Sequence, residues 1–211
     1  AYLKGNKCGN SFWSEKVKNH LSNFYEINNV FLVPSCTAAL EMGALLIGIK
    51  PGDEVIMPSY TFSSTATSIM QFGGKPIFCE INEKTMNIDV NEIESLITEK
   101  TKLILPIDYA GVPCEIEKIK EIGKKYSIPI MIDGAQSFGS RTLTNEWSGN
   151  NADLVTFSFH ETKNISCGEG GALVVNREEW IERANILQEK GTDRKQVLLG
   201  LKNKYSWVDY G

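Results

Sequence analysis

Short apolar runs alternate with amphipathic stretches along most of the chain. Apolar runs that predict strands lie at residues 30–33, 54–58, 75–81, 102–107, 129–132, 153–159 and 171–175. Stretches with helical spacing or composition lie between them, at residues 38–47, 62–72, 91–97, 115–126 and 177–190. Nearly continuous apolar strands separated by helices predict an α/β domain with a mostly parallel central sheet and helices on both faces.

The alternation continues to residue 190 without a linker and then loosens. We therefore expect one folded domain at residues 1–190, followed by an irregular segment at residues 191–211. The sequence of 211 residues begins without Met and stops at Gly211 with no closing helix. Both features suggest that it is incomplete.

The composition narrows the functional classes. Hydrophobic residues make up 42% of the chain, enough for a sizeable core, and the net charge is −4 with no long basic run. These values argue against nucleic-acid binding. No stretch approaches the ~18 apolar residues that a membrane span needs, and residues 1–10 hold no apolar signal core. We expect neither a nucleic acid nor a membrane as partner.

Cysteine and histidine usage points to a compartment and argues against a metal. The five cysteines form no C-x-x-C pair, so we do not expect a disulfide framework. We expect the protein to be located in the reducing cytoplasm. The chain has only two histidines and no tight Cys/His cluster. We expect no metal site.

Three polar clusters follow predicted strands, and ligands of parallel sheets bind at the carboxyl ends of strands. The first is Pro-Ser-Cys-Thr-Ala-Ala at residues 34–39, where a helix opens directly after a strand. Free backbone N–H groups and the helix dipole favour a phosphate there. The alternative is an ordinary helix N-cap by Ser35 or Thr37.

The second cluster is Asp-Gly-Ala-Gln at residues 133–136. Asp133 follows an apolar strand and could hold a cationic ring nitrogen, bind a metal, act as a base or simply cap a helix. The third cluster is Ser-Phe-His-Glu-Thr-Lys-Asn at residues 158–164, before Gly-Glu-Gly-Gly at residues 168–171. Burial near the sheet could free the amine of Lys163 as a nucleophile, although most lysines are solvated surface charges. His160 could equally be structural.

One cofactor explains the three clusters together. Pyridoxal phosphate needs a lysine for its Schiff base, an acid for its ring nitrogen and an N–H cradle for its phosphate. Phe62, close behind another predicted strand, could stack on the ring or be an ordinary core residue. Nucleotide motifs of the G-x-G-x-x-G and P-loop types are absent, as is the G-x-S-x-G motif of serine hydrolases.

Four ordered motifs resemble one known family. They are residues 34–42, 51–62, 133–136 and 158–164 with 168–171, and they are similar to the DegT/DnrJ/StrS sugar-nucleotide aminotransferases. The resemblance runs from about Gly5 to Gly211. It implies pyridoxal phosphate chemistry on the large domain of the aspartate aminotransferase fold (fold type I). Residues 85–89, 109–112 and 204–207 resemble the subgroup that makes dTDP-4-amino-4,6-dideoxygalactose.

The resemblance implies roles at the reacting end of the cofactor. Lys163 would form the Schiff base and shuttle the proton between the substrate carbon and the cofactor. Asp133 would pair with the ring nitrogen, and Gln136 would contact the ring's phenolic oxygen. His160 would line the substrate side.

The resemblance also implies how the rest of the cofactor is held. Thr37 and Ala38 would bind the phosphate at the helix start, and Ser158 would add its hydroxyl. Phe62 would cover the ring face. Cys36 stands where many relatives have Gly, a change that the backbone should tolerate.

The function that the resemblance implies is transfer of an amino group from L-glutamate to a nucleotide-linked keto-deoxysugar. The sugar would be dTDP-4-keto-6-deoxy-D-glucose, used for surface polysaccharide or antigen biosynthesis. Two alternatives are a sugar dehydratase of the same superfamily, in which histidine replaces the lysine, and a non-catalytic fragment. Relatives are homodimers and nearly twice as long, so the C-terminal small domain is expected to be missing from this chain.

Overall fold

The computed structural model describes residues 12–211. Within this range there are seven strands: β1 (Val30–Val33), β2 (Glu54–Pro58), β3 (Lys75–Cys79), β4 (Thr101–Ile104), β5 (Met131–Asp133), β6 (Leu154–Ser158) and β7 (Gly171–Val175). The α-helices are α1 (Phe12–Tyr25), α2 (Cys36–Ile47), α3 (Ser63–Met70), α4 (Val90–Leu96), α5 (Ile116–Tyr126), α6 (Glu178–Gln188) and α7 (Arg194–Leu198). Two short 3-10 helices, η2 (Tyr109–Gly111) and η3 (Ser148–Asn150), lie in loops.

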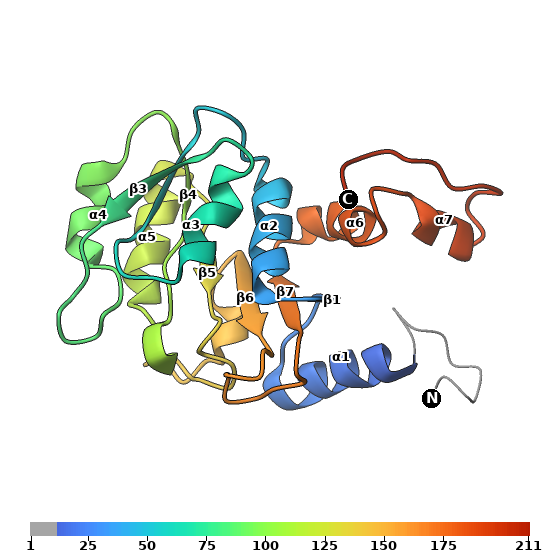
Figure 1. The fold of residues 1–211 in the computed structure, drawn as a ribbon, viewed down its shortest axis with the longest axis horizontal. Coiled ribbons are helices and arrows are strands. Elements are labelled where there is room, and N and C mark those ends of the chain that lie inside the picture. The colour runs from blue at the N-terminus through green and yellow to red at the C-terminus, as the bar shows by residue number, and fades with distance from the viewer. Residues whose placement is uncertain (1–11) are drawn as a thin grey trace.

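The strands form one continuous layer (Figure 1). Ladders give the orders β3-β2-β4 and β1-β7-β6-β5, and parallel bridges from Ile104 to Ile130 and from Ile107 to Asp133 join the two groups. Only β7 runs antiparallel to its neighbours, β6 and β1. The prediction of a mostly parallel sheet is therefore confirmed, with a mixed edge.

Helices cover both faces of this sheet. Alternate residues of β2 enter different cores, since Val55 and Met57 belong to one cluster and Ile56 to the other. The first cluster draws buried residues from α2, α3 and α6, and the second from α1, α4 and α5. Because neighbouring side chains of a strand point to opposite faces, these clusters are the two apolar layers of the predicted α/β domain.

The ends of several predicted elements differ from the observed ones. The strand predicted at residues 102–107 pairs as a regular ladder only over Thr101–Ile104, and beyond it single bonds and bridges remain. The helix predicted from residue 38 begins at Cys36, because the hydroxyl of Ser35 caps it by accepting a hydrogen bond from the N–H of Ala38 at 3.1 Å.

Two helices were not predicted, α1 and α7. The segment predicted to be irregular, residues 191–211, contains α7 and is tied to the rest of the protein. The guanidinium of Arg183 donates to the carboxylate of Asp209 at 2.7 Å and to the carbonyl of Leu46 at 3.2 Å. In Figure 1 this segment projects from one end of the sheet. The proposed division at residue 190 stays a prediction.

The described residues also bear on the expectations about a membrane and about disulfides. No helix among residues 12–211 is long and apolar enough to cross a membrane. The four cysteines of that range, at positions 36, 79, 114 and 167, are free thiols. Cys8 and residues 1–10, on which the expectation about a signal segment rested, lie outside the described residues.

Candidate active site

A cavity of about 440 Å³ lies at the carboxyl ends of β5 and β6 and beside the start of α2. Seven of the eight predicted site residues line it: Thr37, Phe62, Asp133, Gln136, Ser158, His160 and Lys163. Ala38, the eighth, is not among the lining residues, and its N–H is taken up by the cap from Ser35. The predicted residues thus converge on one hollow, although they come from segments far apart in sequence.

Asp133 is the last residue of β5 and is 3% exposed. One carboxylate oxygen, Oδ2, accepts a hydrogen bond from the Thr65 hydroxyl at 2.7 Å, and Oδ1 accepts one from the N–H of Ala135 at 3.1 Å. Burial raises the pKa of Asp133 above its ordinary value, although these two hydrogen bonds and the positive charge of Lys163 act in the opposite direction. The carboxylate is fixed in orientation and still lines the cavity.

Lys163 lies in the loop that follows β6, half-buried at the cavity wall. Its backbone N–H donates to the carbonyl of His160 at 3.0 Å, which closes a tight turn and sets where its side chain begins. The charge of its amine acts on both Asp133 and Cys36. The amine of Lys163 and the carboxylate of Asp133 therefore interact electrostatically.

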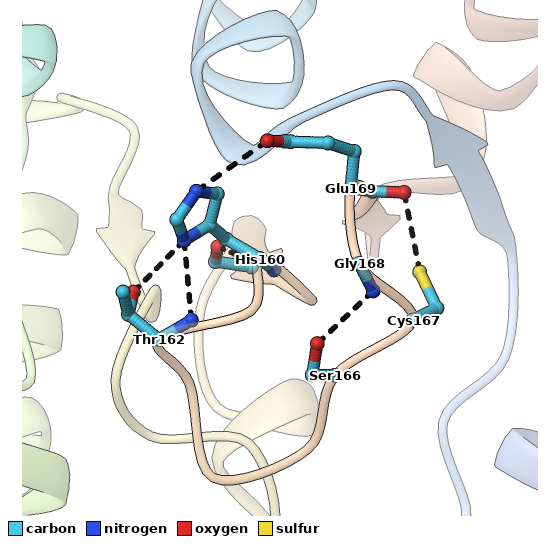
Figure 2. A network of polar contacts seen from close by, with 7 residues as sticks. His160, Thr162, Ser166, Cys167, Gly168 and Glu169 are labelled. Carbon is cyan, nitrogen blue, oxygen red and sulfur yellow. Dashed lines mark hydrogen bonds and ion pairs between the residues drawn. The ribbon is translucent and has the colours of Figure 1, made fainter.

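The ring of His160 has a defined tautomer. The N–H of Thr162 donates to Nδ1 at 3.2 Å, so the proton of the neutral imidazole sits on Nε2 (Figure 2). Nε2 in turn faces the carboxylate of Glu169 at 3.4 Å. Within the same loop the Gly168 N–H donates to the Ser166 hydroxyl at 3.0 Å. The segment carrying Lys163 is thus held by its own polar contacts.

The start of α2 also borders the cavity. A Cβ atom added to Gly171 would lie 2.6 Å from the backbone N of Cys36 and 2.6 Å from the carbonyl O of Ser35. Only glycine therefore lets β7 pack this closely behind the helix start. The hydroxyl of Thr37 and the 5% exposed Ser158 line the cavity on this side.

Phe62 and Gln136 border the remaining sides. Phe62 is 72% exposed at the N-cap of α3, so the alternative that it is a core residue is wrong. Gln136 Oε1 accepts a hydrogen bond from the N–H of Ala110 at 2.6 Å, which fixes the amide. Nearby, the hydroxyls of Tyr60 and Tyr109 lie 3.1 Å apart.

Sequence reasoning missed Thr65, which lies inside α3 and is fully buried. A hydroxyl residue two positions beyond the start of a short helix gave a weak signal. Its contact with Asp133 spans 68 positions of the chain, so no local pattern could have found it.

Comparison with known proteins places the chain in a family. The sequence signature of the DegT/DnrJ/EryC1/StrS aminotransferase family matches residues 3–204. The chain belongs to this family. It is 38% identical over 182 residues to the uncharacterized protein MJ1066 of Methanocaldococcus jannaschii, an alignment that covers 86% of this chain and 46% of that protein.

Solved structures of similar proteins have the same fold as this chain. NtdA from Bacillus subtilis, solved with bound PMP, is 32% identical and superposes with a TM-score of 0.86, covering 100% of this chain and 46% of NtdA. PseC from Helicobacter pylori, an aminotransferase of pseudoaminic acid biosynthesis, is 29% identical with a TM-score of 0.83, covering 94% of this chain and 52% of PseC. The predicted fold type I architecture is confirmed, and the chain spans about half the length of these relatives.

Proposed function

We propose that the protein is a pyridoxal phosphate-dependent sugar aminotransferase. The observation that carries this proposal is the single cavity in which Lys163, Asp133 and the start of α2 meet. Family membership and the likeness to NtdA, solved with bound PMP, support the same cofactor class.

The residues present fit the cofactor at each of its polar ends. Asp133 is a buried acid held by two donors, suited to a cationic ring nitrogen. The start of α2 brings Cys36 and Thr37 to the cavity, and the N–H groups at a helix start suit a phosphate. Ser158 adds a second hydroxyl residue at the cavity, and Gly171 lets β7 pack closely behind the start of α2.

When bound, pyridoxal phosphate supplies an aldehyde that takes up amines and a ring that accepts electrons from a deprotonated carbon. The Lys163 amine would hold that aldehyde covalently and, once released, carry a proton between substrate and cofactor. Asp133 would keep a positive charge on the ring nitrogen. Phe62 would lie against the ring, and Gln136 would face its phenolic oxygen, since Ala110 already fixes that amide.

His160 would serve the substrate side of the cavity. With its proton on Nε2 and its Nδ1 tied to Thr162, the ring presents a fixed edge next to Lys163. Glu169 limits rotation of this ring. This arrangement would position a substrate beside Lys163.

We further propose that L-glutamate is the amino donor and that dTDP-4-keto-6-deoxy-D-glucose is the acceptor, in the biosynthesis of a surface polysaccharide or antigen. The resemblance to transaminases of dTDP-sugars supports this choice. A homodimer in the cytoplasm is part of the same proposal. Exposed large apolar side chains support burial against a partner surface: Phe12, Trp13 and Phe24 of α1, and Leu198, Leu201 and Trp207 near the C-terminus.

Two alternatives predict different residues or products. A dehydratase of the superfamily would carry histidine in place of the lysine, and Lys163 disfavours that reading. A non-catalytic protein would have no need for the buried Asp133 next to a lysine, because burying an acid costs stability.

The test is a half-reaction followed by a full turnover. The full-length protein loaded with pyridoxal phosphate and given L-glutamate should release one equivalent of 2-oxoglutarate, and Lys163→Ala should release none. With dTDP-4-keto-6-deoxy-D-glucose added, mass spectrometry should find an amine in place of the keto oxygen. A product that has lost a hydroxyl would indicate the dehydratase, and no reaction with any amino donor would refute the proposal.

A further inference from the structure

The segment that follows β2 carries Phe62, which lines the cavity, and also Thr65, which donates a hydrogen bond to Asp133. Thr65, fully buried in the first turn of α3, points its hydroxyl at Asp133 Oδ2 at 2.7 Å. The hydroxyl of Thr61 lies 2.7 Å from the same Thr65 oxygen. Three polar side chains therefore form a chain that ends on the acid at the cavity wall.

The direction of these hydrogen bonds follows from counting protons. An ionised carboxylate only accepts, so the single hydroxyl proton of Thr65 goes to Asp133. The Thr65 oxygen must then accept from Thr61, whose proton is the only one left for that contact. Chains of hydrogen bonds that run in one direction strengthen each other in a low-dielectric interior.

Thr65 is itself held in place. Its N–H donates to the carbonyl of Phe62 at 3.1 Å, and its carbonyl accepts from the hydroxyl of Ser68 at 3.1 Å. These bonds fix the backbone from which the Thr65 side chain projects, and the side chain itself is fully buried. The acid at the end of β5 is thereby locked to the turn that carries Phe62.

We propose that Thr65, supported by Thr61, is a positioning residue that keeps the Asp133 carboxylate ionised and aimed into the cavity for the ring nitrogen of the cofactor. This inference rests on the proposed function, because it assigns Asp133 the cofactor's ring. The Thr65 donor occupies Oδ2, and Oδ1 accepts from the N–H of Ala135 and lies 4.0 Å from the Cys36 thiol. The acid's own orientation is then set before any ligand enters, which is what a preorganised site requires.

The first experiment measures the pKa of Asp133 in the absence of cofactor. Carboxyl-carbon NMR of the cofactor-free full-length protein, with Asp133→Asn to assign the signal, gives the pKa of Asp133. Thr65→Val keeps the shape but removes the donor, so the pKa should rise by about 1 or more. Thr65→Ser restores the hydroxyl and should restore the pKa. Thr67→Val, the same change at an exposed position of α3, is the matched control.

The second experiment adds pyridoxal phosphate and measures its dissociation constant. Thr65→Val should bind about 10-fold more weakly or worse, with a smaller loss for Thr61→Val and none for Thr67→Val. If Thr65→Val leaves the pKa of Asp133 or the dissociation constant unchanged, the positioning role is refuted while the proposed function stands. If the parent protein itself does not bind pyridoxal phosphate, the proposed function fails, whatever the NMR result.

Discussion

Replacing Gly171 with Ala tests how tightly β7 supports the start of α2. The new Cβ would lie 2.6 Å from the Cys36 backbone N and 2.6 Å from the Ser35 carbonyl O, whereas ordinary carbon contacts are about 3.5–4.0 Å. Both obstacles are backbone atoms, so the helix start must move by about 1 Å rather than a side chain rotate. Overpacking of this kind costs about 1–3 kcal/mol, and we expect the upper end.

The assay combines thermal unfolding with a titration of pyridoxal phosphate. A loss of about 3 kcal/mol would lower the melting temperature by roughly 6–12 °C for a domain of this size. Because a 1 Å misplacement in a binding site can cost on the order of 10²-fold, the dissociation constant of the cofactor should rise by about 10- to 100-fold.

Gly48→Ala is the matched control at the other end of α2. Gly48 has a φ of +78° and no atom within 4 Å of an added Cβ, so its cost comes from the left-handed backbone alone, about 1–2 kcal/mol. It should lower stability without changing cofactor affinity. If Gly171→Ala were as stable as the parent protein, or destabilised with unchanged cofactor affinity, the packing argument would be wrong.

Three further predictions use other parts of the molecule. Burial raises the pKa of Asp108 to about 6, above about 3.9 in an unfolded chain, so this acid lowers stability progressively between about pH 4 and pH 6. Asp108→Asn, which still accepts from the Cys114 N–H, should therefore gain about 2 kcal/mol more relative to the parent protein at pH 7 than at pH 4; equal differences in urea unfolding at both pH values would contradict this. Arg183→Ala removes the contact with Asp209, so limited proteolysis should cut residues 191–211 faster while the unfolding free energy falls by about 1 kcal/mol at most; an unchanged cleavage rate would argue against that anchor. Phe62→Ala should leave stability within about 0.5 kcal/mol, because the side chain is 72% exposed, yet weaken pyridoxal phosphate binding about 3- to 10-fold through lost stacking; unaltered binding would remove Phe62 from the site.

The sequence was sufficient for the layers because the strands of a buried parallel sheet are themselves apolar. Runs such as residues 54–58 and 171–175 are fully buried and appear at the predicted positions. Helix α1 was not predicted although Trp13, Val17 and Leu21 are spaced four residues apart. Its apolar positions are sparse among polar ones, and in the structure Leu21 is buried while Trp13 and Val17 are exposed.

The site was predictable in part, because each polar cluster directly follows an apolar strand. Asp133 and Lys163 could be assigned to the same edge on that basis. The contacts that orient the site depend on strand order, which a local pattern does not encode. The Thr65–Asp133 hydrogen bond and the one from Ala110 to Gln136 both join segments that meet only in the folded sheet.

Borohydride reduction tests the central claim most directly. The full-length protein is incubated with pyridoxal phosphate, reduced, digested and analysed by mass spectrometry. A lysine that holds the cofactor's aldehyde becomes a stable secondary amine, so the pyridoxyl group should appear on the peptide containing Lys163 and be lost in Lys163→Ala. A pyridoxyl group on a different lysine, or none in the folded protein, would contradict the account.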